Sequence, residues 1–188
     1  MNTLVIGGAG FIGTHLVSEL LAAGRKVTVL DRRTDAPPEL PQGADYVAGD
    51  FGQCELIREL LRGHGEVIHL AYTSVPKTSF ENPFSDLLEN LPPTVQLFAE
   101  AAESGSRLVF VSSGGTVYGE AGTLPICEDH PTKPISPYGL TKLTLEGYAH
   151  LYAVTHGLKF VCVRPANAFG PGQKPFTGQG FIASAMTS

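Results

Sequence analysis

The chain is 188 residues long, is 43% hydrophobic and carries a formal net charge of −5. This length fits one globular domain of about 100–200 residues, and the scattered Lys and Arg residues exclude the basic surface that nucleic-acid binding requires. No apolar run is long enough to cross a bilayer, and no charged segment precedes an apolar one as in a secretion signal. We therefore expect a cytoplasmic protein with no nucleic-acid partner and no membrane partner.

The cysteines and histidines lack the spacing of a metal site. Cys54, Cys127 and Cys162 are odd in number, far apart and without a CxxC pair, and the six histidines contain no HExxH pair. This usage is typical of a reducing compartment and predicts neither a disulfide framework nor a metal site.

Apolar runs alternate with amphipathic stretches along the whole chain. The runs predict strands at 3–7, 26–31, 44–50, 66–71, 107–113 and 158–165. The stretches between them predict helices at 11–23, 53–62, 83–104 and 137–156. This alternation is typical of an α/β fold with a doubly wound parallel sheet and helices on both faces.

Two consecutive prolines interrupt the third predicted helix. Pro92 and Pro93 lie well inside the segment 83–104. Because proline removes a backbone hydrogen bond and clashes in a helix interior, we predict a kink here, or two helices that meet at 90–93.

A glycine-rich segment directly follows the first predicted strand and begins a helix. It reads GGAGFIG at 7–13, with Gly7, Gly10 and Gly13 in the spacing GxxGxxG. Glycine allows a tight turn and a close approach of the backbone to a pyrophosphate, which the free N–H groups and the positive end of the helix dipole attract. The segment therefore predicts a phosphate-binding loop.

The second predicted strand ends in an acidic residue, Asp31. An acid about 20 residues beyond such a loop binds the ribose hydroxyls of a dinucleotide, so the two features together predict a Rossmann-type dinucleotide site. Asp31 repels the 2′-phosphate of NADP and favours NAD, although Arg32 and Arg33 could instead accept that phosphate.

A tyrosine and a lysine share one face of the fourth predicted helix. Ser136 caps this helix, and Tyr138 and Lys142 are four residues apart. An ammonium about 4 Å from the phenol contributes roughly 4 kcal/mol, enough to lower the phenol pKa from about 10 to near 7. A surface helix on which the two side chains merely pack has the same pattern, but the dinucleotide site upstream favours a catalytic acid/base pair.

Jointly, these motifs resemble the extended short-chain dehydrogenase/reductase family, in its NAD-dependent epimerase/dehydratase branch, and most of all its nucleotide-sugar 4-epimerases. The resemblance covers essentially the whole chain. Its motifs are GGAGFIG (7–13), Asp31, GD (49–50), HLA (69–71), SSGGTVYG (112–119), YGLTK (138–142) and RPANAFGPG (164–172).

The resemblance implies roles for individual residues. For NAD it implies contacts from Gly7, Gly10, Phe11, Ile12 and Gly13 at the pyrophosphate, Asp31 with Arg32 beside it at the adenosine ribose, and Asp50 and Phe51 at the adenine. Leu70, Ala71 and Tyr72 would line the path to the nicotinamide, and Asn90 matches a cofactor-site asparagine on the helix behind it. It implies that Tyr138 and Lys142 form the catalytic pair and that Asn167 lies near the phosphates of the sugar nucleotide.

The chain departs from the family pattern in three places. Family members often carry Ser or Thr at the position of Gly114, so the hydroxyl that bonds the sugar must come from Ser113 or Thr116, or is absent. Thr116 is then both a catalytic and a substrate-binding candidate. Ser74 and Pro92 also replace the residues usual in the family.

The resemblance implies an enzyme that inverts C4 of a UDP- or dTDP-sugar. Tyr138 as a phenolate would take the proton of the C4 hydroxyl while hydride moves to NAD, and the 4-keto sugar would then turn and receive the hydride on its other face. A dehydratase or reductase of the same branch is an alternative, but dehydratases carry an Asp-Glu pair where this chain has Gly115 and Thr116. A non-catalytic dinucleotide sensor is another alternative, which the intact Tyr138 and Lys142 disfavour.

The resemblance also implies the domain organisation. Residues 1–188 form the NAD-binding Rossmann domain, and 165–188 begin a substrate-binding region that is largely absent from this chain. We therefore interpret the chain as the N-terminal part of a longer protein. A homodimer is expected through the helices near 83–104 and 137–156.

Overall fold

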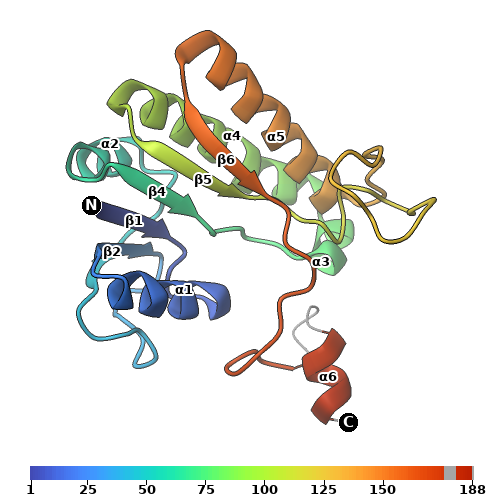
Figure 1. Cartoon of the computed structure of the whole chain (residues 1–188), viewed down its shortest axis with the longest axis horizontal. Coiled ribbons are helices and arrows are strands. Elements are labelled where there is room, and N and C mark those ends of the chain that lie inside the picture. The colour runs from blue at the N-terminus through green and yellow to red at the C-terminus, as the bar shows by residue number, and fades with distance from the viewer. Residues whose placement is uncertain (176–180, 188) are drawn as a thin grey trace.

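The computed structural model describes residues 1–175 and 181–187, and its centre is a parallel sheet (Figure 1). The strands are β1 (Asn2–Ile6), β2 (Lys26–Asp31), β3 (Asp45–Ala48), β4 (Glu66–His69), β5 (Arg107–Val111) and β6 (Lys159–Val163). They lie in the order β3-β2-β1-β4-β5-β6, and every neighbouring pair is parallel. This is the doubly wound order of the Rossmann fold, so the predicted fold class is confirmed.

Helices cover both faces of the sheet. The helices are α1 (Phe11–Ala22), α2 (Cys54–Gly63), α3 (Pro76–Glu81), α4 (Pro83–Ser104), α5 (Pro137–His156) and α6 (Phe181–Thr187). One core, built around Leu4, Ile57, Phe98, Phe110 and Leu145, joins α2, α4 and α5 to one face. A smaller core around Val5, Val17 and Val29 joins α1 to the other face. Figure 1 shows α4 and α5 side by side behind β5 and β6.

Three of the predicted strands continue past the point where the observed strands end. The strands β4, β5 and β6 end at His69, Val111 and Val163, two residues earlier than the sequence pattern indicates in each case. The backbone N–H groups of Leu70 and Ala71 both donate to the carbonyl of Ile6, at 2.9 and 3.1 Å. After β5 and β6 the backbone still pairs, since the Ser112 N–H donates to the Val163 carbonyl at 2.8 Å. The residues that follow the three strands line a site at the carboxyl edge of the sheet.

The third predicted helix is a single helix, α4, with both prolines inside it. The prediction of two helices meeting at 90–93 is wrong. The Asn82 side chain caps the start of α4 by accepting a hydrogen bond from the Ser85 N–H at 3.0 Å. The buried face of α4 continues across the prolines from Asn90 to Thr94. Burial of this face against the sheet and α5 offsets the hydrogen bonds that the prolines remove.

The short helix α3 has no counterpart among the predicted elements. Pro76 occupies its first turn, and Thr78 and Val75 exchange hydrogen bonds there at 3.0 and 3.2 Å. Within the described part of the chain, no helix is both long and apolar enough to span a bilayer.

Candidate functional site

Two adjoining cavities lie at the carboxyl edge of the sheet. The larger has a volume of about 890 Å³ and the smaller about 210 Å³. Leu70 and Tyr72, in the segment that follows β4, line both cavities. Ligands of open α/β sheets bind at this edge, where the strand order reverses between β1 and β4. The pair of cavities therefore suits one extended ligand together with a second molecule that meets it.

The glycine loop between β1 and α1 is packed too tightly for side chains. Gly7 has φ +80°, and a Cβ there would lie 2.8 Å from the Ala71 nitrogen. A Cβ on Gly13 would lie 2.6 Å from the Gly7 carbonyl oxygen. Gly10 is the N-cap of α1, and no side chain caps the first N–H groups of this helix. Because Gly7 and Gly10 line the smaller cavity, these groups can receive an anion there.

The smaller cavity collects most of the residues expected at adenosine. Asp31, Arg32 and Phe51 line it, together with Gly7, Gly10, Leu70, Ala71 and Tyr72. The Asp31 carboxylate accepts a hydrogen bond from the Arg33 N–H at 3.3 Å, and Arg33 does not line the cavity.

Asp50 and Asn90 line neither cavity. The Asp50 carboxylate accepts a hydrogen bond from the Gly52 N–H at 2.8 Å and lies 4.0 Å from the Arg32 guanidinium. The buried Asn90 side chain accepts from the Thr73 N–H at 3.0 Å and donates to the Thr73 hydroxyl at 2.9 Å. Asn90 therefore fixes the segment after β4 from behind the cavities.

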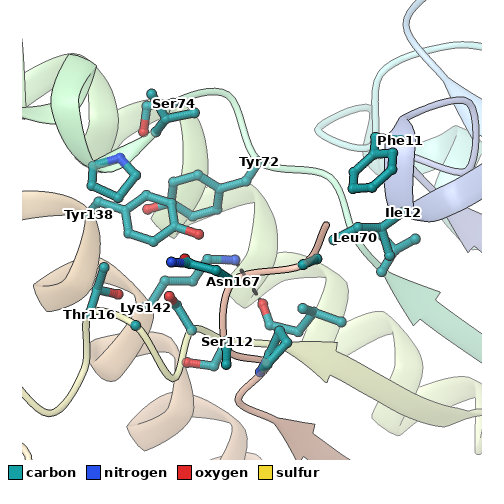
Figure 2. A pocket seen from close by; sticks show the side chains of 18 of the residues that line it. Phe11, Ile12, Leu70, Tyr72, Ser74, Ser112, Thr116, Tyr138, Lys142 and Asn167 are labelled. Carbon is teal, nitrogen blue, oxygen red and sulfur yellow. Dashed lines mark hydrogen bonds between the residues drawn. The ribbon is translucent and has the colours of Figure 1, made fainter. Parts of the chain in front are cut away.

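The larger cavity brings Tyr138 and Lys142 together with the other residues predicted at the reacting sugar (Figure 2). Ser136 caps α5 by accepting from the Gly139 N–H at 3.1 Å, and the Ser79 hydroxyl on α3 accepts from the Tyr138 N–H at 3.2 Å. Lys142 donates to the Val111 carbonyl at 2.8 Å, and its Nζ lies 4.1 Å from the centroid of the Tyr72 ring. The predicted placement of the pair on one face of α5 is confirmed.

The predicted lowering of the Tyr138 pKa is wrong for the chain as described. Burial raises the pKa of Tyr138 to about 12, and the Ser113 hydroxyl that faces the phenol opposes this increase. Burial also lowers the pKa of Lys142 to about 7. The Lys142 ammonium points at the Val111 carbonyl and lies 5.7 Å from the centroid of the Tyr138 ring. Loss of water around both groups therefore outweighs their mutual attraction.

Candidate hydroxyls and an amide lie opposite the tyrosine. Ser113, Thr116 and Asn167 line the larger cavity, as do Phe11 and Ile12 of the first turn of α1. The Thr116 Oγ1 atom is buried and has no hydrogen-bond partner in the described part of the chain. A buried hydroxyl without a partner is costly unless a ligand satisfies it. Thr116 is therefore the stronger of the two hydroxyl candidates.

Gly114 is fixed by the backbone that follows β6. The Gly114 N–H donates to the Pro165 carbonyl at 2.8 Å, and a Cβ on Gly114 would lie 2.7 Å from the Arg164 carbonyl oxygen. This contact excludes a serine or threonine from the position where related sequences often have one. The departure from the family pattern thus has a packing cause.

Sequence reasoning missed three hydrogen-bonding residues behind the cavity: Ser79, Asp86 and Thr141. Asp86 lies four residues before Asn90 on the same buried face of α4. That spacing was a usable signal, because residues four apart lie on one side of a helix.

Comparison with known proteins places these features in a family. Residues 3–188 match the NAD dependent epimerase/dehydratase family. The chain is 38% identical over 191 residues to a UDP-glucose 4-epimerase of Mycolicibacterium smegmatis, covering 97% of this chain and 61% of the relative.

Two solved structures show the same architecture. The Thermotoga maritima UDP-glucose 4-epimerase with UDP-glucose matches with a TM-score of 0.90 at 33% identity, over 97% of this chain and 61% of that one. The Thermus thermophilus UDP-glucose 4-epimerase complex with NAD matches with a TM-score of 0.85 at 37% identity, over 93% of this chain and 58% of that one. The chain thus spans about 60% of the length of these relatives.

We predict that Gly114→Ser destabilises the fold, because the new side chain collides with the carbonyls of Arg164 and Pro165. The expected loss in the free energy of unfolding is about 1–3 kcal/mol, measured by urea denaturation. Gly115→Ser is the matched control, since a Cβ there meets only the Asn167 Oδ1 atom at 3.7 Å. Equal stability of both variants would contradict the packing explanation.

Proposed function

Since the chain belongs to the NAD dependent epimerase/dehydratase family, we propose that it forms the dinucleotide-binding part of an enzyme that inverts C4 of a nucleotide sugar. The observation that carries the proposal is the position of Tyr138 and Lys142 in a cavity that adjoins the glycine-loop cavity and shares Leu70 and Tyr72 with it. A sugar at the pair would meet the reactive end of a dinucleotide seated on the loop.

The residues of the smaller cavity fit NAD. Gly7 and Gly10 present backbone without side chains, the first N–H groups of α1 are uncapped, and Asp31 suits the two hydroxyls of a ribose. Phe51 offers an aromatic ring to the adenine. Bound in its oxidised form, NAD supplies a hydride acceptor and a positive charge.

We assign Tyr138 the proton of the C4 hydroxyl. Burial raises the pKa of this phenol to about 12, so positive charge must be close to it when it acts as a base. Lys142, when protonated, provides part of that charge, and Thr116 orients the sugar through its unpartnered hydroxyl. When the proton returns, Tyr138 acts as the acid.

The lining of the larger cavity favours epimerisation over dehydration. Elimination of water from a sugar requires an acid and a base besides the tyrosine. Among the described residues that line this cavity there is no Asp or Glu. Gly115 and Thr116 occupy the positions where the dehydratases that this chain resembles carry acids, and neither exchanges a proton near neutral pH.

We also propose that the chain forms a homodimer through α4 and α5. The two helices pack on each other and leave apolar side chains in water: Phe84, Leu87, Leu88, Leu140, Leu151 and Val154, which are 43–72% exposed. Exposed apolar side chains on packed helices suit an interaction site, and a second copy presents the same side chains in a two-fold arrangement.

We also propose that residues 165–188 begin the region that binds the nucleotide sugar.

The experiment that tests the proposed reaction incubates the complete product of the reading frame with NAD and a panel of UDP- and dTDP-sugars. We expect interconversion of C4 epimers and no 4-keto-6-deoxy sugar, as followed by NMR. Tyr138→Phe should lower turnover by at least about 10²-fold because it removes the proton-transfer group. Thr116→Val should lower it by about 10²–10³-fold, the usual effect of losing one catalytic hydrogen-bond donor.

NAD binding by Tyr138→Phe, measured by calorimetry, is the control for that experiment, and it should be retained. A 4-keto-6-deoxy product would refute the epimerase proposal. Full activity of Thr116→Val would move the hydroxyl role to Ser113.

We predict that the chain binds NAD more tightly than NADP, because the Asp31 carboxylate in the smaller cavity repels a 2′-phosphate. Calorimetric titration of both dinucleotides measures the preference. Asp31→Asn removes the repulsion and should reduce the preference for NAD over NADP. Tighter binding of NADP to the unmodified chain would instead assign Arg32 and Arg33 to the phosphate.

We predict a dimer mass in sedimentation velocity and a monomer mass for the double variant Leu151→Lys and Val154→Lys, which places charge in the proposed interface. Val161→Lys on β6 is the matched control, since Val161 is also apolar and 59% exposed but lies outside α4 and α5. A monomeric unmodified protein at micromolar concentration would contradict the interface.

A further inference from the structure

A buried carboxylate lies behind the proposed catalytic pair. Asp86 on α4 is 2% exposed. One carboxylate oxygen accepts a hydrogen bond from the Ser74 hydroxyl, and the other accepts from the Thr141 hydroxyl at 2.9 Å. No Lys, Arg or His in the described part of the chain lies within ion-pair distance of it. A carboxylate buried without a cation is costly, which calls for a reason.

Other well-buried carboxylates of these helices have such a partner. Glu100 on α4 pairs with the Arg58 guanidinium at 2.7 Å. Glu146 on α5 pairs with the Arg164 guanidinium at 2.5 Å. Asp86 thus differs from its neighbours in leaving its negative charge without a guanidinium, although hydroxyl groups hold it in place.

The hydrogen bond from Thr141 brings Asp86 close to the turn of α5 that carries Lys142, the next residue in the chain. Asp86 also contributes to the raised pKa of Tyr138. Burial lowers the pKa of Lys142 to about 7, and the charged forms of Cys162, Asp86 and Glu146 would each oppose this decrease. Burial raises the pKa of the Cys162 thiol to about 12, so it is neutral near pH 7, and Arg164 balances the charge of Glu146.

The other groups around Lys142 carry no charge near pH 7. The Tyr72 and Phe110 rings lie 4.1 and 5.2 Å from Nζ, and the Val111 carbonyl accepts its hydrogen bond. Burial lowers the pKa of His69 on β4 to about 3, which leaves it neutral. Asp86 is therefore the one facing carboxylate, among the described residues, whose charge no guanidinium offsets.

Asp86 also connects the three segments that build the pair. It joins α4 to Ser74, in the segment after β4, and to Thr141, which precedes Lys142 on α5. Figure 2 shows the Tyr72 side chain extending from this segment to lie beside Tyr138. The Tyr72 ring meets the Tyr138 ring edge-on, with 4.8 Å between the centroids. A shift of Asp86 would thus move both Tyr72 and Lys142, which lie next to the Tyr138 phenol.

We propose that Asp86 is a positioning residue that fixes Tyr72 and α5 around Tyr138 and places a negative charge near Lys142, which favours the ammonium form of this lysine. It touches neither cavity, so it acts through Lys142 and not on the sugar. The proposal rests on the proposed role of Tyr138 and Lys142 in proton transfer. Its physical core, the charge of Asp86 acting on Lys142, can be measured without turnover.

The test is an NMR titration of the chain labelled with ¹³C at lysine Cε, with the Lys142 signal assigned from the Lys142→Arg variant. In the unmodified chain Lys142 should titrate near pH 7. Asp86→Asn keeps the shape but removes the negative charge that favours the ammonium, so the midpoint should fall by about one unit. Asp86→Glu, which keeps the charge, should restore it.

Glu100→Gln is the matched control, because it also removes a buried carboxylate from α4, and it should leave the Lys142 midpoint unchanged. If Asp86→Asn does not fold, Thr141→Val removes one hydrogen bond that stabilises the Asp86 charge and should lower the midpoint by a smaller amount. An unchanged midpoint in Asp86→Asn, or in Thr141→Val where it replaces that variant, overturns the proposal. Absence of sugar turnover alone would refute only the proposed function.

Discussion

The divergence of the chain after β1 and β4 is the constraint on which the rest of the site depends. These neighbouring strands end together, and the N–H groups of Leu70 and Ala71 both bond the carbonyl of Ile6. One chain segment then turns into α1 on one face, while the other runs towards α3 and α4 on the opposite face. The two cavities open between the diverging segments, so the glycine loop has to pack directly on Ala71 and can carry no side chain at Gly7.

Burial gives the site its chemical character. Without a ligand, loss of water raises the pKa of Tyr138 to about 12 and lowers the pKa of Lys142 to about 7, so both groups are driven towards their neutral forms. Charge near the pair therefore controls it strongly, because a dry site screens electrostatic interactions little. The carboxylate of Asp86 acts on both members, since its charge favours the protonated forms of Tyr138 and of Lys142, whereas a positively charged ligand favours the phenolate of Tyr138.

The sequence predicted the features that depend on local pattern. Strand and helix order, the caps of α5, the placement of Asp31 and the shared face of Tyr138 and Lys142 all follow from periodicity and short spacings. Contacts between distant segments could not be predicted. Gly114 is fixed by the carbonyl of Arg164, fifty residues away in sequence, and the pKa of Tyr138 depends on burial that no spacing reveals.

The prolines of α4 show the same limit of local reasoning. Proline has a poor intrinsic preference for a helix interior, yet tertiary packing of the face that carries Asn90, Thr94 and Phe98 keeps the helix continuous. That continuity has a consequence for the site. Asp86 and Asn90 precede Pro92 on one rigid element, whose later turns are anchored in the main core. The helix can therefore hold the segment after β4 and the base of α5 at a fixed distance from the sheet, which the proposed proton transfer between Tyr138 and a sugar requires.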